Sequence, residues 1–174
     1  TGFNCTNPTK NLINTNDRSQ NRPDHDKRRN TITSIHWAPT LKSSSLLLGV
    51  NCSDHIHYYQ GGLPFKYLLY DPMNLKIVEE VILGPDLDKG HKLQVCVPGG
   101  VWKCGHILTT ADNDDANVDK LNYEYSLIGE AVAPGFDYHD FAWVKEEQVR
   151  DTFQNKGYKS NEMMKVLLAY IHES

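Results

Sequence analysis

Short segments that alternate apolar and polar residues follow one another from Thr31 to Ala133, and this pattern constrains the fold more than any other feature. Turn residues separate the segments at spacings of roughly 8–12 residues, which is typical of a β-sandwich or barrel. The clusters "PMN" and "PGG" predict two hairpins, because their residues favour tight turns. The expected strands are 31–37, 45–50, 55–60, 65–71, 75–83, 91–97, 101–108 and 123–133.

The two ends of the chain differ from this middle part in their pattern of polar and apolar residues. The first thirty residues are polar and lack apolar periodicity, so they predict an arm or long loop. After Val144 the apolar residues recur at helical spacing, as Val149 and Phe153 do. We therefore expect a polar N-terminal arm at 1–30, a β-barrel at 31–145 and a helical extension at 146–174.

Charge and hydrophobicity exclude two classes of partner. The chain has 18 basic and 22 acidic residues, a formal net charge of -4, whereas nucleic-acid binding needs a basic surface. No apolar run approaches the roughly 20 residues that span a bilayer. We expect neither a nucleic acid nor a membrane as partner.

Three features together favour a secreted glycoprotein. The chain begins with Thr1 rather than Met, and glycosylation sequons occur at Asn4 and Asn51. The cysteine count is even, with Cys5, Cys52, Cys96 and Cys104, but the sequence leaves the connectivity open. Cys96 and Cys104 flank "PGG" and could pair, or both could be buried free thiols.

Two longer stretches of sequence resemble a known family. "LQVCVPGGVWKCGHI" is followed by "YSLIGEAVAPGFDYHDFAWV", which contains Val-Ala-Pro-Gly-Phe-Asp-x-x-Asp-Phe from Val132 to Phe141. This signature is similar to that of the cupin subfamily catalogued as a domain of unknown function, within the RmlC-like jelly-roll superfamily, and the similarity extends over roughly residues 15–145. The resemblance implies a double-stranded β-helix, a cupin jelly-roll barrel, with one small-molecule cavity and a homodimeric assembly.

The sequence departs from this family at the positions that would hold a metal. Where the family has Asp-Glu-Ile-Trp, this chain has Asp54-His55-Ile56-His57, and its "SLLLGV" segment lacks the family's His-Arg pair. Cupins generally bind their metal through His-x-His, a Glu and a later His, and the later strand here offers Trp102. The resemblance alone therefore does not imply a cofactor.

The pair His55 and His57 is the main candidate for chemistry. Residues two apart in a strand share one face, so both imidazoles and Tyr59 point the same way, toward the cavity if the resemblance holds. Four interpretations stay open: acid–base catalysis, a polar ligand-binding wall, an exposed sheet surface, or a divalent metal with His36, His91 or His106 as third ligand.

We favour a small-molecule enzyme without a cofactor, either an isomerase or a lyase, in which His55 and His57 act as general acid and base. The alternatives are a secreted carrier that binds a small organic ligand without turnover, and a metal-dependent cupin enzyme. The expected catalytic residues are His55, His57 and Tyr59. The expected substrate-binding residues are His36, a tyrosine of "FKYLLYD" assigned to position 68, Gln94, Trp102, Cys104 and Phe136.

Overall fold

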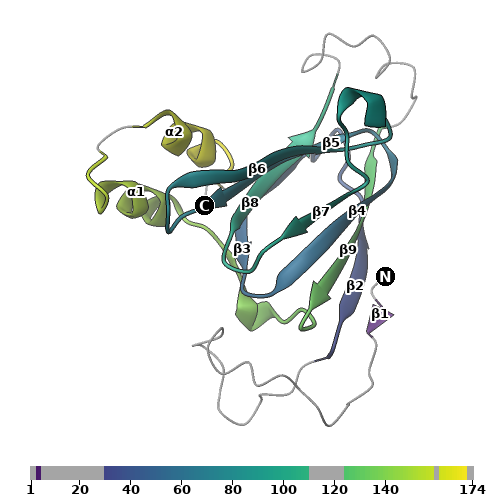
Figure 1. The fold of residues 1–174 in the computed structure, drawn as a ribbon, viewed down its shortest axis with the longest axis horizontal. Coiled ribbons are helices and arrows are strands. Elements are labelled where there is room, and N and C mark those ends of the chain that lie inside the picture. Colours follow the sequence, from purple (N-terminus) through teal and green to yellow (C-terminus); the bar gives the residue numbers. More distant parts are fainter. Residues whose placement is uncertain (1–2, 5–29, 110–123, 159–160, 172–174) are drawn as a thin grey trace.

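The structure is a computed structural model that describes residues 3–4, 30–109, 124–158 and 161–171. The strands of these residues form two antiparallel sheets that face each other (Figure 1). The first sheet has the order β1 (Phe3–Asn4), β2 (Thr33–Trp37), β9 (Ser126–Ala133), β4 (Asp54–Gly62) and β7 (Gln94–Val97). The second has the order β10 (Phe141–Trp143), β3 (Ser45–Asn51), β8 (Trp102–Ile107), β5 (Phe65–Asp71) and β6 (Lys76–Leu83). This arrangement confirms the predicted all-β jelly-roll with C-terminal helices.

Apolar side chains from both sheets fill the space between them. In β7, for example, Val95 and Val97 are buried whereas Gln94 and Cys96 are exposed. On the opposite sheet, Tyr67 of β5 has no exposed surface. The strand alternation in the sequence therefore reflects one face turned inward and one turned outward.

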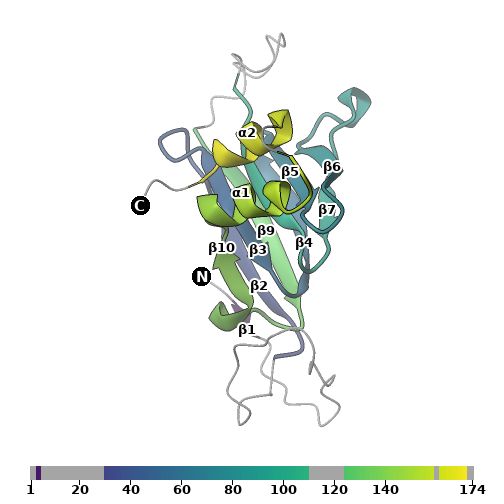
Figure 2. The same cartoon turned by 90° about the vertical axis from the view of Figure 1, so that its left-hand side faces the viewer.

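The helices α1 (Glu146–Gln154) and α2 (Glu162–Leu168) cover the outer face of the second sheet (Figure 2). Phe153 of α1 and Leu167 of α2 are buried there against Tyr70 and Trp102. In the central strands β5 and β8 both faces are thus buried, one toward the barrel and one toward the helices. Among the described residues, neither helix is long and apolar enough to cross a membrane. Two 3-10 helices lie at Leu87–Lys89 and at Tyr138–Asp140 (η3).

One of the two predicted hairpins is confirmed and the other is wrong. β5 and β6 pair antiparallel across the "PMN" turn, as expected, with a register shift between Leu69 and Tyr70. The strands around "PGG" do not pair with each other, because β7 joins β4 in the first sheet and β8 joins β3 and β5 in the second. Gly100 has a φ of 83°, so this tight turn carries the chain from one sheet to the other.

This crossing also separates Cys96 from Cys104. Cys96 is exposed on the first sheet, and Cys104 is buried under the helices. Of the two alternatives left open by the sequence, the structure has free thiols, although only Cys104 is buried; Cys52 is also free. Cys5 lies outside the described residues. Asn51 of the second sequon is only 2% exposed, and its Oδ1 accepts a hydrogen bond from the Ser53 amide; glycosylation of this residue stays a prediction.

Candidate functional site

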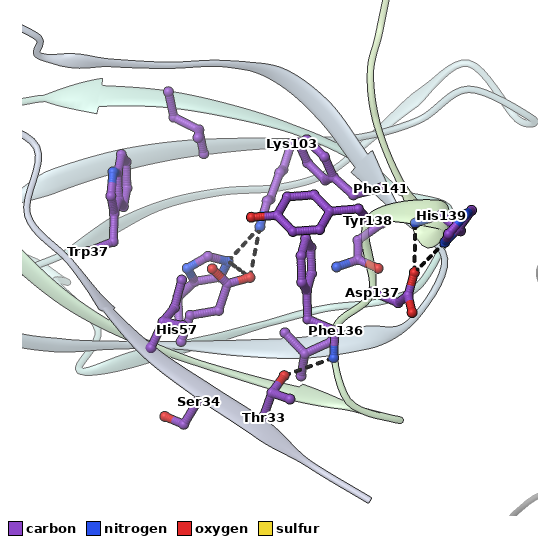
Figure 3. Close-up of a pocket in the computed structure, with 15 residues that line it drawn as sticks. Thr33, Ser34, Trp37, His57, Lys103, Phe136, Asp137, Tyr138, His139 and Phe141 are labelled. Carbon is purple, nitrogen blue, oxygen red and sulfur yellow. Dashed lines mark hydrogen bonds and ion pairs between the residues drawn. The ribbon is translucent and has the colours of Figure 1, made fainter. Parts of the chain in front are cut away.

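A cavity of about 850 Å³ lies between the two sheets, beside β2 and η3. Three of its polar lining residues come from three different strands: His57 and Lys103 are buried, and Glu130 is half-buried. Aromatic residues also line it, and they come closer to solvent: Phe136 is 36% exposed and Tyr138 is 84% exposed. Figure 3 shows the polar group and these aromatic side chains around the same space. The cavity therefore has a buried polar end and an aromatic rim.

The ammonium of Lys103 is the centre of the polar group. Its Nζ lies 2.9 Å from Nε2 of His55, 3.0 Å from Nε2 of His57 and 3.2 Å from Oε1 of Glu130. Lys103 itself is 6% exposed. An ammonium has three N–H donors, and these three acceptors match them one to one.

The other nitrogen of each imidazole determines which tautomer is present. Nδ1 of His55 lies 3.0 Å from the carbonyl oxygen of Ser53, which only accepts, so this nitrogen carries the proton. Nδ1 of His57 lies 3.2 Å from the hydroxyl of Tyr67 and donates to it, because Nε2 accepts from Lys103. Both rings therefore direct an Nε2 lone pair at the ammonium.

Burial dominates the electrostatics of these groups. Desolvation, followed by the charge of Lys103, lowers the pKa of His55 to about 4. The same two causes hold the pKa of His57 well below its usual value. Burial also lowers the pKa of Lys103, while the carboxylate of Glu130 opposes this effect. The imidazoles are neutral at pH 7, so the charged pair at this site is Lys103 with Glu130.

The strand register explains why these residues meet. His57 of β4 and Glu130 of β9 are direct partners on neighbouring strands, so their side chains emerge side by side on the inward face. Lys103 reaches them from β8 in the opposite sheet. Glu130 lies on the same face of β9 as the buried residues Ile128 and Val132, and Lys103 lies on the same face of β8 as the buried residue Ile107.

The donors of this site include a set of the kind that binds a transition metal. One ligand atom from each of His55, His57 and Glu130 lies within 4.8 Å of the others, and this set suits zinc or iron. However, Lys103 Nζ lies within 3.2 Å of all three side chains, and a metal bound to them would overlap the ammonium. With Lys103 in this position, the residues do not fit a metal ion.

Four of the expected substrate-binding residues lie on outward faces of the two sheets, away from the cavity, which corrects their expected location. His36 and Gln94 are exposed on the first sheet. Trp102 and Cys104 are buried against α1 and α2 on the outer face of β8, because the inward positions of that strand are the alternate ones.

The remaining expected residues give a mixed result. Position 68 is a leucine, and Leu68 faces the helices; the tyrosine next to it, Tyr67, faces the barrel and contacts His57. Tyr59 donates a 2.6 Å hydrogen bond from its hydroxyl to the Gly62 carbonyl and does not line the cavity. Phe136 does line it, and so does His57, while His55 lies behind Lys103.

Other histidines that could have supplied a metal ligand are engaged elsewhere. Nδ1 of His91 accepts from the amide of Asp86, and Nδ1 of His106 lies 2.6 Å from the Tyr170 hydroxyl. The third side chain of the site is instead Glu130, which the sequence reasoning missed together with Lys103. Each is a charged residue within a mostly apolar strand, and this charge was the feature of the sequence that could have indicated a functional site.

Residues 6–144 match the sequence model of the family described as "Cupin superfamily (DUF985)". Among curated proteins, the uncharacterized protein YML079W of Saccharomyces cerevisiae is 31% identical over 119 residues. The aligned region covers 68% of this chain and 53% of that protein, so this chain spans about half the length of its relative.

Solved structures with the same fold include a hypothetical protein from Leishmania major, with a TM-score of 0.65, 25% identity, and coverage of 87% of this chain and 82% of that one. Protein SO0799 from Shewanella oneidensis has a TM-score of 0.66 and 19% identity, with 90% and 86% coverage. A dTDP sugar isomerase from Desulfovibrio desulfuricans has a TM-score of 0.51 and 12% identity, with 71% and 70% coverage. The last two likenesses extend to the fold alone.

Proposed function

This chain belongs to the cupin superfamily family DUF985, and from that premise we propose that it rearranges a small organic molecule by metal-independent proton transfer, as an isomerase or a lyase. The observation that carries the proposal is the ion pair of Lys103 and Glu130, 3.2 Å apart at the buried end of the cavity. A carboxylate and an ammonium held together can remove a proton and stabilise the negative charge that results.

The proposed reaction begins on a carbon next to a carbonyl group. The carboxylate of Glu130 takes a proton from this carbon, and the electron pair of the C–H bond moves to the carbonyl oxygen. The ammonium of Lys103 stabilises the enolate oxygen. In an isomerase, Glu130 returns the proton to a different position or face. In a lyase, a leaving group departs from the next carbon with its electron pair and takes up the proton.

This assignment changes the role expected for the two histidines. Their Nε2 atoms accept from Lys103, and neither is protonated at neutral pH, so they act as positioning residues for the ammonium. The substrate would enter past Phe136 and Tyr138, which suits a molecule with an apolar or aromatic part next to its carbonyl group. The fold of the dTDP sugar isomerase is compatible with this reaction class, but at 12% identity it does not indicate the substrate.

A carrier without catalytic activity is the second candidate. It is favoured by one observation, namely that the three donors of Lys103 already have three acceptors within the protein. A polar group whose hydrogen bonds are all made within the protein can hold the two sheets together and can still present a charge to a ligand. Both candidates use the same cavity, so binding alone does not separate them.

Hydrogen–deuterium exchange separates them without knowledge of the natural substrate. A panel of small oxo acids and hydroxy ketones is incubated with the protein in D₂O, and NMR follows the loss of the proton next to the carbonyl. An enzyme accelerates this loss for some of the compounds, and Glu130→Gln lowers the rate by about 10²–10⁴-fold. Glu147→Gln, on the exposed surface of α1, is the matched control and leaves the rate unchanged. Compounds that bind without any protein-dependent exchange would indicate the carrier.

A further inference from the structure

We propose that the ammonium of Lys103 acts as the resident cation of a three-ligand metal centre and excludes divalent ions from the barrel. Removal of this ammonium would therefore turn His55, His57 and Glu130 into a binding site for zinc or cobalt. The inference concerns which cation the site holds. It does not depend on whether the protein catalyses the reaction proposed above.

The surroundings of Lys103 Nζ match those of a bound cation. Two imidazole nitrogens and one carboxylate oxygen surround it at 2.9, 3.0 and 3.2 Å. The same three residues form a group of potential metal ligands in the part of the chain that the structure describes. Nitrogen and oxygen donors of these kinds are the usual ligands of catalytic zinc and of non-haem iron.

The two imidazoles already have the tautomer and support that a metal would require. Metal-bound histidines usually donate their second N–H to a carbonyl, carboxylate or water, which fixes the ring. Here Nδ1 of His55 donates to the Ser53 carbonyl, and Nδ1 of His57 donates to the Tyr67 hydroxyl. The lone pairs directed at Lys103 are therefore also directed at the place where an ion would bind.

The distances require only a small contraction. A zinc ion binds nitrogen and oxygen at about 2.0–2.2 Å, so each ligand would move inward by about 1 Å. Nε2 of His57 and Oε1 of Glu130 are 3.7 Å apart. Two ligands of a tetrahedral ion with these bond lengths are about 3.4 Å apart. The pair is thus already close to the required separation.

Lys103 has two advantages over an ion from solution. It is covalently attached to β8, so its effective concentration at the site is high and does not depend on the ion content of the medium. Its single charge also balances Glu130, whereas a divalent ion next to a displaced Lys103 would leave like charges in a buried space. Both effects favour the ammonium over the metal.

The test compares metal binding by tag-free wild-type protein and Lys103→Met, which has a side chain of similar length without charge. Each protein is incubated with Co²⁺, passed through gel filtration and measured for bound metal and visible d–d absorption. We expect Lys103→Met to retain about one ion per chain and to bind it about 100-fold more tightly than wild type. The additional change His57→Phe should abolish this binding. Lys92→Met, at an exposed surface position, is the matched control and should behave as wild type.

Three results would overturn the inference. Wild-type protein could retain an ion that His57→Phe removes, which would mean that Lys103 does not exclude metals. Folded Lys103→Met could bind no more Co²⁺ than wild type. Lys103→Met could fail to fold without an ion. It is then refolded with Co²⁺, because ion binding should restore folding. A variant that stays unfolded in the presence of the ion would also contradict the inference. Deuterium exchange is measured separately, so failure of the proposed function remains distinguishable.

Discussion

Nζ of Lys103 lies 3.0 Å from Nε2 of His57, although β8 and β4 belong to opposite sheets. The same ammonium also contacts Glu130 of β9, at 3.2 Å. This contact is a polar link across the interior of a barrel whose other cross-sheet contacts are mainly apolar. The group that we propose for chemistry is therefore also part of what holds the two sheets together.

We expect Lys103→Met to destabilise the protein strongly. The substitution removes the partner of a largely buried carboxylate and the donor to two buried imidazoles. Loss of one member of a buried ion pair typically costs about 3–5 kcal/mol, which urea denaturation at neutral pH would measure. Lys92→Met removes an ion pair with Glu79 on the surface and should cost less than about 1 kcal/mol. Equal costs for the two variants would show that the buried pair does not stabilise the fold.

His55 should make the protein less stable in acid. Its pKa is lowered from 6.5 to about 4, so between these values the unfolded chain binds more protons than the folded one. The effect of His55 on the free energy of unfolding is constant above pH 6.5. As the pH falls from 6.5 toward 4, this residue lowers the free energy of unfolding by about 3 kcal/mol in total. In His55→Gln the side chain keeps an acceptor for Lys103 but does not titrate. Urea midpoints of wild type and His55→Gln should converge on acidification, and parallel curves would refute the assignment.

Much of the fold was predictable because it depends on local patterns. Alternation of apolar and polar residues located the strands, and the signature from Val132 to Phe141 indicated the jelly-roll. The turn residues of "PGG" were identified correctly as a turn, but they do not specify which sheet the next strand joins. The second hairpin was therefore wrong, and the open alternative that Cys96 pairs with Cys104 is excluded.

The site was less predictable because its central contact joins distant strands. The parity of β4 correctly put His55 and His57 on one inward face. In β8 nearly every residue is buried, since one face meets the barrel and the other meets the helices, so burial does not reveal the inward face. Trp102 was chosen for the cavity because the family that the sequence resembles has a tryptophan at this position, and Lys103 was missed. Secretion and a homodimer stay predictions.

The cysteines should differ sharply in reactivity. Burial raises the pKa of the Cys104 thiol to about 12, whereas Cys96 is exposed. A thiolate is the reactive form, so a thiol-specific reagent should modify Cys96 in the native protein and reach Cys104 only after unfolding. Peptide mapping by mass spectrometry identifies the modified residue, and Cys96→Ser removes the signal of the peptide that contains position 96. Modification of Cys104 at the same rate as Cys96 would contradict the packing of the helices on β8.

Phe153 should be the main anchor of the helical extension. It is 1% exposed, and its ring stacks on that of Tyr70, with centroids 6.0 Å apart. Phe153→Ala should lower the free energy of unfolding by about 3–5 kcal/mol, the usual cost of such a cavity. The control is the neighbouring exposed residue Gln154. Gln154→Ala should change the free energy of unfolding by no more than about 0.5 kcal/mol. A small effect of Phe153→Ala would mean that the extension stabilises the barrel little.

The aromatic rim should contribute to binding of an anionic aromatic probe. Anilinonaphthalene sulfonate combines apolar rings with one negative charge, and the cavity combines the Phe136 side chain with the ammonium of Lys103. Phe136→Ala removes apolar contact area worth about 1–2 kcal/mol, so the dissociation constant should rise about 5–30-fold in a fluorescence titration. Met73→Ala removes an apolar side chain that is 77% exposed, in the turn between β5 and β6 and away from the cavity, and should leave binding unchanged. Because Phe136 is 36% exposed, its removal should alter stability much less than removal of Phe153 does. Equal binding by both variants would mean that the probe binds outside the cavity and that the rim does not select ligands.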